Sequence, residues 1–222
     1  YQQQLYSRVL RFFGIGESQL VTVLADLIDK QTDPTLAPYA KVGEVTLRLS
    51  TKADSQEEAN VRLNQLEEEI LQRDHLRDFF YAYGDDNSLV KTVATLLEEE
   101  KQSLGILENG TGGLLQAELS LALAGQPYYS GGKIIGQLGT ESGGLSEEAS
   151  HIREELQADL GLVVSVVVKP ESTVDNVLAK VYLALASTSG IYKKEVDLGG
   201  YSWQYLRQLA CLQALDFVRN TL

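Results

Sequence analysis

A glycine-rich segment, Leu107-Glu-Asn-Gly-Thr-Gly-Gly-Leu114, is the part of the sequence best suited to chemistry. It lies between a short apolar stretch that predicts a strand and a periodic stretch that predicts a helix. Such a turn exposes backbone amides at a helix N-terminus, where an anion such as a phosphate binds. We therefore predict a ligand-binding turn, with a purely structural turn as the alternative. Its residues are Glu108, Thr111, Gly112 and Gly113.

Other side chains that could catalyse a reaction lack partners at a useful spacing. His75 and His151 lie in charged, helix-like contexts without a His-x-x-x-His pattern, so we expect surface residues and no metal site. Ser130 precedes two glycines, but no Gly-x-Ser-x-Gly elbow surrounds it. Cys211 lies among alanine and leucine residues, which predicts a buried thiol. A single cysteine also excludes an internal disulfide and is typical of a reducing compartment.

The composition disfavours nucleic acids and membranes as binding partners of this protein. The chain has 222 residues and a net charge of −12, and a surface of that sign repels nucleic acid and anionic lipid. No apolar run approaches the roughly 20 residues that cross a bilayer. We therefore predict a soluble, cytoplasmic protein that binds neither membranes nor nucleic acid. The sequence contains no methionine, which predicts a fragment of a longer protein.

Residues 1–86 predict a small α+β domain, with alternating apolar residues in its strands and a capping box at one helix. Two prolines, at 34 and 38, predict an extended loop between the first helix and the second strand. The domain lacks the basic groove and Gly-x-x-Gly loop with which KH modules bind RNA. The expected elements are a strand at 6–13, a helix capped by Ser18, a strand at 45–49, a helix capped by Ser55 and a strand at 79–83.

Residues 87–222 predict a larger α/β domain, in which helices cover a sheet. Apolar runs bounded by turn residues indicate the strands, and a 3.6-residue period indicates the helices. The expected elements are helices at 88–101, 114–123 and 203–218, a helix capped by Ser146, and strands at 104–107, 133–135, 162–168, 181–186 and 192–196, with a tight turn at 108–113.

Three segments, at 8–18, 37–41 and 43–49, resemble the KH-like middle part of the bacterial CinA (competence and damage inducible) family. The stretch at 108–113 is similar to the Glu-Ser-Cys-Thr-Gly-Gly turn of the CinA carboxy-terminal domain. In that family this domain hydrolyses the amide of nicotinamide mononucleotide. The resemblance implies a KH-like domain followed by a deamidase-like α/β domain. It also implies a further amino-terminal domain, related to molybdopterin-binding proteins, that this sequence does not contain.

Several catalytic elements of the family are changed in this chain. Asn109 stands where the family has its serine nucleophile, and Gly110 stands where it has a cysteine. An asparagine amide cannot form the covalent acyl intermediate that a hydroxyl forms. The family's Tyr-Ser-Asn-Glu-Ala-Lys loop is replaced by residues 133–140, which implies a deletion.

Two further family elements differ near the carboxyl end of the chain. Residues 166–170 replace a Gly-x-Ala-Gly-Pro ligand loop, and Tyr201 occupies the place of an expected arginine. Arg207 matches an arginine of the last helix. Because losing a nucleophile alone removes several orders of magnitude of rate, these changes together predict a pseudoenzyme without catalytic residues or cofactors.

We therefore expect a non-catalytic domain that serves as a binding or oligomerisation module. Its expected partners are a nicotinamide or adenine nucleotide at the glycine-rich turn, a second copy in a homodimer, and a protein of competence or recombination. The alternative is an active nicotinamide-nucleotide amidohydrolase that uses Thr111 or Ser130 as its nucleophile.

Overall fold

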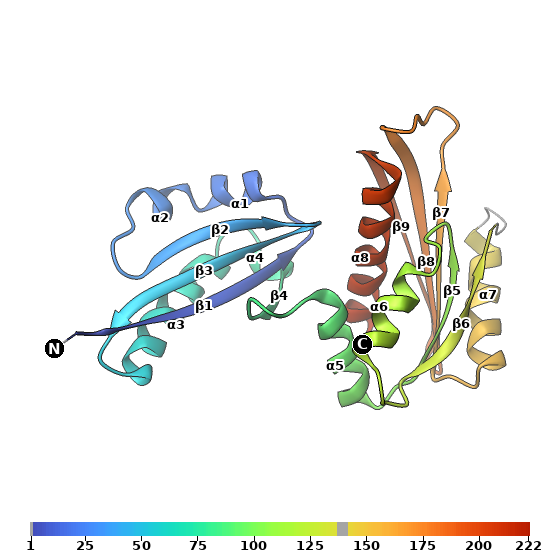
Figure 1. Cartoon of the computed structure of the whole chain (residues 1–222), viewed down its shortest axis with the longest axis horizontal. Coiled ribbons are helices and arrows are strands. Elements are labelled where there is room, and N and C mark those ends of the chain that lie inside the picture. The colour runs from blue at the N-terminus through green and yellow to red at the C-terminus, as the bar shows by residue number, and fades with distance from the viewer. Residues whose placement is uncertain (1, 137–141) are drawn as a thin grey trace. The chain divides into compact units, whose positions relative to one another are not determined.

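The computed structural model describes residues 2–136 and 142–222. The chain folds into two compact units, one that ends at Ser88 and one that begins at Leu89 (Figure 1). In the part of the chain that the structure describes, none of the helices is long and apolar enough to cross a membrane.

The first unit is a four-stranded sheet with the strand order β2-β3-β1-β4, in which all neighbours are antiparallel. Alternate residues of β1 and β3, such as Leu10 and Leu47, form one core with Leu20 and Leu63 from the helices. Its elements are β1 (Gln4–Phe13), α1 (Glu17–Val23), α2 (Ala25–Asp29), β2 (Thr35–Lys41), β3 (Glu44–Ala53), α3 (Gln56–Leu71), α4 (Leu76–Phe79) and β4 (Phe80–Tyr83).

Three local predictions for this unit can be compared with the structure. The capping box is confirmed, because the Ser55 hydroxyl accepts from the Glu58 amide at 3.1 Å. The single helix capped by Ser18 is wrong: two short helices form, and the first has Gly16 as its N-cap. The proline-framed loop is also wrong, because it forms the edge strand β2, where Pro38 is tolerated since one side of an edge strand needs no partner.

The second unit is a five-stranded sheet with the order β6-β5-β7-β8-β9. The first three strands in this order are parallel, and β8 and β9 are antiparallel to their neighbours. The elements are α5 (Leu89–Glu100), β5 (Leu104–Asn109), α6 (Leu114–Ala122), β6 (Tyr129–Ile135), α7 (Ser142–Glu155), β7 (Leu160–Val168), β8 (Val177–Ser187), β9 (Gly190–Tyr201) and α8 (Trp203–Thr221).

Helices cover both faces of this second sheet (Figure 1). Helix α7 packs on one face, where Ala149 and Ile152 contact Leu107 of β5 and Val163 of β7. Helices α5, α6 and α8 pack against one another on the opposite face. The predicted fold class is therefore confirmed: a small α+β part is followed by a larger α/β part with a helix-covered sheet.

Two predicted boundaries in this unit are wrong in a way that affects the site. Strand β5 continues through Glu108 and Asn109, so these two residues belong to the strand and not to the turn. Helix α7 begins at Ser142, so Ser146 lies inside the helix and not at its cap. Because successive residues of a strand point to opposite faces, the longer β5 separates the side chains of Glu108 and Asn109.

Candidate functional site

The Glu108 carboxylate points toward helix α6 and is completely buried. It accepts a hydrogen bond from the Thr111 hydroxyl at 2.6 Å and bonds from the backbone amides of Leu115 at 3.0 Å and Gln116 at 3.1 Å. Gly113, the N-cap of α6, has no side chain to cap the helix. Glu108 therefore supplies the cap from the neighbouring strand and occupies the anion site at the helix N-terminus.

In this arrangement, three of the four residues predicted to bind a ligand are buried. Glu108 and Thr111 are both 0 % exposed and are bonded to one another. Gly113 is buried, and Gly112 is exposed with a φ of 64°. Two amides that would have received a ligand anion are occupied by Glu108. Ligand binding by this turn stays a prediction. Of the four residues predicted to bind a ligand, Gly112 is the one exposed to solvent.

The Asn109 side chain points to the other face of the sheet, the face that α7 covers. Its Nδ2 donates to the Ser165 hydroxyl at 3.0 Å, and both side chains are buried. Its Oδ1 is also buried and has no hydrogen-bond partner among the residues that the structure describes. An unpaired buried acceptor costs about 1–3 kcal/mol, which a ligand that donates a hydrogen bond would recover.

Asn109 begins a row of polar residues that crosses the sheet on one face. Asn109 lies opposite Ser165, Ser165 lies opposite Tyr182, and Tyr182 lies opposite Glu195. Residues that are directly opposite in neighbouring strands share a face. The sequence analysis missed Ser165, although it is the one polar residue within the apolar run Leu160–Val168.

The turn that follows Asn109 is packed tightly against strand β7. Gly110 has a φ of 87°, and a Cβ added to it would lie 3.0 Å from the Cβ of Val166. A left-handed φ and this close approach both require glycine. Gly110 and Val166, at both of which the resemblance implies a departure from the family pattern, are therefore in contact.

Arg207 of α8 holds the opposite side of the turn. Its Nη2 donates to the Thr111 carbonyl at 3.1 Å, and its guanidinium lies against Gly112. Its Nε is buried without a partner among the described residues. Arg207, which by resemblance matches an arginine of the family's last helix, is thus in contact with the turn.

The two alternative nucleophiles lie in unfavourable places. The Thr111 hydroxyl donates its proton to Glu108 and is inaccessible. Ser130 lies near the start of β6, because Tyr129 pairs with Leu104 whereas Ile135 pairs with Asn109. Five residues of strand separate these ends by about 15 Å. Ser130 therefore lies at the wrong end of the sheet for a site at Asn109.

The burial of Cys211 and the exposure of the two histidines agree with their sequence-based interpretation. Cys211 is buried, and burial followed by the nearby Glu108 and Glu118 carboxylates raises the pKa of its thiol, so it stays protonated. His75 and His151 are exposed. Among the described residues, no group of three or more His, Cys, Asp or Glu side chains could hold a metal ion. The predicted loop deletion concerns residues 133–140, of which 137–140 lie outside the described residues.

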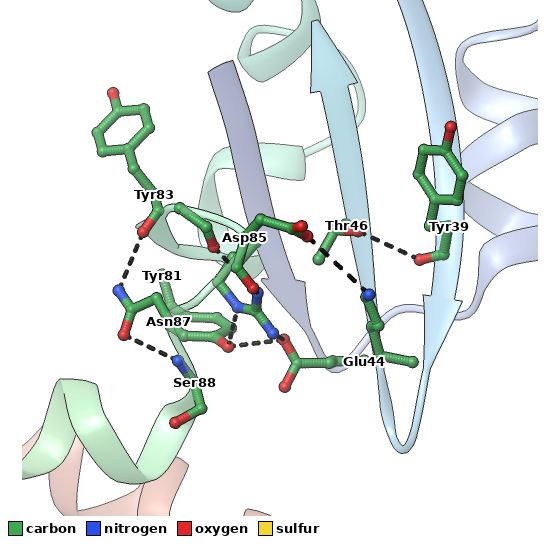
Figure 2. A network of polar contacts seen from close by, with 11 residues as sticks. Tyr39, Glu44, Thr46, Tyr81, Tyr83, Asp85, Asn87 and Ser88 are labelled. Carbon is green, nitrogen blue, oxygen red and sulfur yellow. Dashed lines mark hydrogen bonds and ion pairs between the residues drawn. The ribbon is translucent and has the colours of Figure 1, made fainter. Parts of the chain in front are cut away.

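A second buried polar cluster lies in the first unit, around Arg11 of β1. Its Nη2 donates to the Glu44 carboxylate at 2.8 Å and its Nε donates to the Tyr81 hydroxyl at 2.9 Å. Its Nη1 donates to the carbonyls of Gly84 at 3.0 Å and Asp85 at 3.2 Å. The Tyr81 hydroxyl in turn donates to Glu44 at 2.6 Å, and Figure 2 shows these two side chains pointing toward one another.

This cluster anchors the segment that leaves β4. The Asp85 carboxylate pairs with Arg48 at 3.3 Å and Lys41 at 4.0 Å, while Arg11 holds the Asp85 backbone. Burial, followed by the hydrogen bond to Glu44, raises the pKa of Tyr81. The guanidinium of Arg11 donates from all three of its nitrogens, so the cluster has the features of a structural clamp.

The family comparison agrees with the architecture of the first unit. The model of the damage-inducible protein CinA KH domain matches residues 7–82. A competence-damage inducible protein of Streptococcus suis is 83% identical over 221 residues, which is 100% of this chain and 56% of the relative. The chain belongs to the CinA family. It spans about half the length of the curated CinA relatives that it matches.

More distant CinA proteins extend this comparison. A Streptococcus gordonii relative is 41% identical over 243 residues, which covers 99% of this chain and 58% of the relative. A CinA superfamily structure from Escherichia coli has a TM-score of 0.51 and 19% identity over 66% of this chain and 97% of its own. One from Agrobacterium tumefaciens has a TM-score of 0.50 and 16% identity over 60% and 96%. At this identity the two structures show a shared CinA fold.

Proposed function

We propose that the second unit is a non-catalytic CinA domain that binds a nicotinamide or adenine nucleotide beside Asn109. The observation that carries this proposal is the buried Asn109 side chain, whose Oδ1 has no partner among the described residues. By resemblance, this side chain stands where the family has its nucleophile. Asn109 Oδ1 therefore offers a ligand a hydrogen-bond acceptor at the position where, by resemblance, the family has the hydroxyl oxygen of its nucleophile.

The chemistry of amide hydrolysis supports the absence of turnover. An acyl-enzyme mechanism needs a hydroxyl or thiol activated by a base. Thr111 is buried against Glu108, and Ser130 lies at the other end of β6. Ser165 is the hydroxyl adjacent to Asn109, but its oxygen accepts from Asn109 and it is 1 % exposed.

The alignment with the S. gordonii relative supports a missing loop. That alignment covers 243 positions, about 20 more than this chain has residues, whereas the S. suis alignment covers 221. The more distant relative therefore carries residues that this chain lacks. A deletion of the segment that assists catalysis in the family agrees with this difference.

An assay of ammonia release from nicotinamide mononucleotide tests the loss of activity. We expect no turnover above the uncatalysed rate, because no activated hydroxyl of the described residues faces Asn109. Variants Thr111→Ala, Ser130→Ala and Ser165→Ala serve as probes. Turnover that one of these variants abolishes would overturn the proposal and identify the replacement nucleophile.

Titration calorimetry with nicotinamide mononucleotide and with adenosine monophosphate tests the binding role. We expect heat of binding with one of these nucleotides and at least a tenfold loss of affinity in Asn109→Ala, which removes the acceptor. The Gly125→Ala variant, at an exposed turn, is the control. Binding that Asn109→Ala leaves unchanged would place the ligand elsewhere.

The oligomeric role belongs to the same proposal. We propose that the chain forms a homodimer and contacts a protein of competence or recombination in its cytoplasmic setting. Sedimentation equilibrium at micromolar concentration measures the dimer directly. A monomer under these conditions would contradict the oligomerisation part and leave the nucleotide-binding part in place.

A further inference from the structure

Strand β9 is an open edge of the second sheet. It is 12 residues long and, among the described strands, pairs with β8 alone. In an antiparallel pair, every second residue directs its N–H and C=O away from the partner strand. About half of β9 therefore presents backbone donors and acceptors to solvent, and residues 190–195 are exposed throughout. Such an edge is a template on which another strand can pair.

The other three sheet edges in the described structure are shorter than β9. Strand β4 has 4 residues, and β2 and β6 have 7 each. On β2, Pro38 has no N–H to offer, and the N–H of Leu36 already donates to Gln31 Oε1 at 2.9 Å. Short length, proline and charge are the usual protections of an open edge. Because β9 is long and contains no proline, its side-chain charges decide which strand it accepts.

The charged side chains of β9 have both signs on one face of the sheet. Lys193, Glu195 and Asp197 occupy alternate positions of the strand. They lie on the face that α7 covers, because Lys193 is opposite Ala184, a residue of the core beneath α7. In the described part of the chain, Lys193 is exposed and has no carboxylate in ion-pair contact. A uniformly basic edge would repel a copy of itself, whereas mixed charges can be complementary to one.

Two antiparallel copies of β9 have complementary charges when Glu195 lies on the two-fold axis. Opposite residues of such a pair share a face, and a two-fold axis places one residue opposite its own copy. With Glu195 on the axis, Lys193 of each copy lies opposite Asp197 of the other. Glu195 then faces Glu195 of the second copy, but each of these carboxylates is already paired with Lys180 of its own chain at 3.5 Å.

The two neighbouring registers are less favourable. With Lys194 on the axis, two lysines without a carboxylate in ion-pair contact among the described residues would face one another. With Val196 on the axis, Glu195 would lie opposite Asp197 at two places. Like charges that are directly opposite destabilise a strand pair. The charge pattern therefore selects the register centred on Glu195.

We propose that β9 is the homodimer surface of the second unit and pairs antiparallel with β9 of a second copy, with Glu195 on the two-fold axis. The two sheets then form one continuous sheet, and each Lys193 gains a carboxylate that its own chain does not supply. On the opposite face, Tyr192, which is 44 % exposed, meets Leu198 of the second copy. The inference rests on the homodimer of the proposed function and adds the surface that forms it.

Sedimentation equilibrium of charge-reversal variants of the whole chain, at micromolar concentration, tests the surface. Lys193→Glu and Asp197→Lys each place like charges opposite one another at two positions, so we expect each to weaken the dimer about tenfold. The double variant Lys193→Glu/Asp197→Lys restores opposite charges and is expected to recover the wild-type affinity. Lys101→Glu, at an exposed lysine outside β9, is the control with the same change of net charge as Lys193→Glu.

Disulfide formation tests the register. Opposite residues of antiparallel neighbours have Cα atoms about 4.5–5.5 Å apart, a distance that a disulfide spans. Under mild oxidation, we therefore expect Glu195→Cys to give a covalent dimer on non-reducing electrophoresis. Lys194→Cys lies one residue off the axis and is expected to give at least fivefold less. The native Cys211 is buried and is not expected to contribute. Equal cross-linking by the two variants would overturn the register.

The outcomes distinguish this inference from the function on which it rests. If the wild-type chain dimerises and the charge reversals leave its affinity unchanged, or the double variant fails to recover it, the β9 surface is wrong and the homodimer stands. If the wild-type chain is a monomer, the homodimer and this surface both fail. Nucleotide binding is measured at Asn109 on β5, three strands from β9, and is decided separately. Circular dichroism checks that each variant keeps its sheet, since the substituted β9 residues are exposed.

Discussion

Among the described residues three carboxylates are buried, and two of them, Glu44 and Glu108, are neutralised in different ways. Glu44 in the first unit accepts from a guanidinium and a phenol, the side chains of Arg11 and Tyr81. Glu108 in the second unit accepts from one hydroxyl and two backbone amides at the start of α6. A formal positive charge therefore balances the first carboxylate, and the partial charge of a helix terminus balances the second.

The surroundings of these two carboxylates differ in whether the nearby buried polar atoms all have hydrogen-bond partners. Every nitrogen of the Arg11 guanidinium has an acceptor. In the described part of the chain, the buried side-chain atoms without a partner are Asn109 Oδ1, at the end of β5, and Nε of Arg207, whose guanidinium bonds to the turn that follows. A saturated cluster stabilises a fold, whereas unpaired buried atoms mark a place where a ligand recovers their cost.

Removal of the charge from the first cluster is expected to have the largest effect. Arg11→Met leaves Glu44 buried without its cation, which costs about 3–5 kcal/mol of unfolding free energy. The double variant Arg11→Met/Glu44→Leu is expected to recover most of this loss. Urea unfolding followed by far-ultraviolet circular dichroism measures both, and a loss below about 1 kcal/mol in the single variant would show that the pair is solvated.

Neutralisation of the second carboxylate is expected to cost less, because no ionised side chain is left unpaired. Glu108→Gln weakens three hydrogen bonds and places an NH₂ group, itself a donor, near the backbone N–H donors of α6. We expect it to lower the unfolding free energy by about 2–3 kcal/mol. Trp203, the sole tryptophan, lies in the second unit, so its fluorescence follows that unit.

Glu118→Gln is the matched control for Glu108→Gln, since Glu118 lies on the same helix and is exposed. Partial desolvation of the carboxylate and the neighbouring Glu108 raise the pKa of Glu118, so loss of its charge is expected to be neutral or slightly stabilising. Equal destabilisation by both variants would contradict a capping role for Glu108.

The tight packing of the turn predicts a smaller effect. Gly110→Ala places a side chain on a left-handed backbone and brings its Cβ close to Val166. We expect the variant to lose about 2 kcal/mol of unfolding free energy. Gly125→Ala has a similar φ of 80° with nothing within 4 Å of the added Cβ, so it measures the backbone strain alone. Urea unfolding followed by Trp203 fluorescence compares the two variants. An equal loss of unfolding free energy in both would show that the contact with Val166 contributes nothing.

The smallest predicted effect concerns alkaline pH and the first unit. Burial raises the pKa of Tyr81, so above pH 10 the unfolded phenol ionises while the folded one stays protonated. The folded state then binds more protons than the unfolded state, and stability falls as pH rises. Tyr81→Phe is expected to flatten this fall by about 1 kcal/mol, as measured by urea unfolding from pH 8 to 11. An unchanged slope would contradict a buried phenol.

Patterns within short segments predicted the fold of this chain well. The capping box at Ser55 and the apolar runs that form β7 and β8 have a local physical cause, which the sequence displays directly. The ends of elements were predicted less well. Strand β5 includes Glu108 and Asn109, and the Asn109 amide bonds to Ser165, a partner 56 residues away that no short window of sequence contains.

The site itself was predicted only in part. The glycine-rich turn was found from its composition, and the burial of Cys211 followed from its apolar neighbours. The separation of Glu108 from Asn109 onto opposite faces depends on the length of β5. The pairing of Asn109 with Ser165 depends on a parallel register between strands 56 residues apart. Such long-range registers are set by tertiary packing, which single-segment patterns do not encode.

The contact between Gly110 and Val166 restricts which side chains position 110 can carry, including the cysteine that the resemblance implies for the family. A mutation that restored cysteine at position 110 would collide with Val166 before it could restore any chemistry. The bulky residue on β7 would have to shrink first, in a step that brings no benefit by itself. A return to cysteine at position 110 therefore depends on a prior change on a different strand, 56 residues further along the chain.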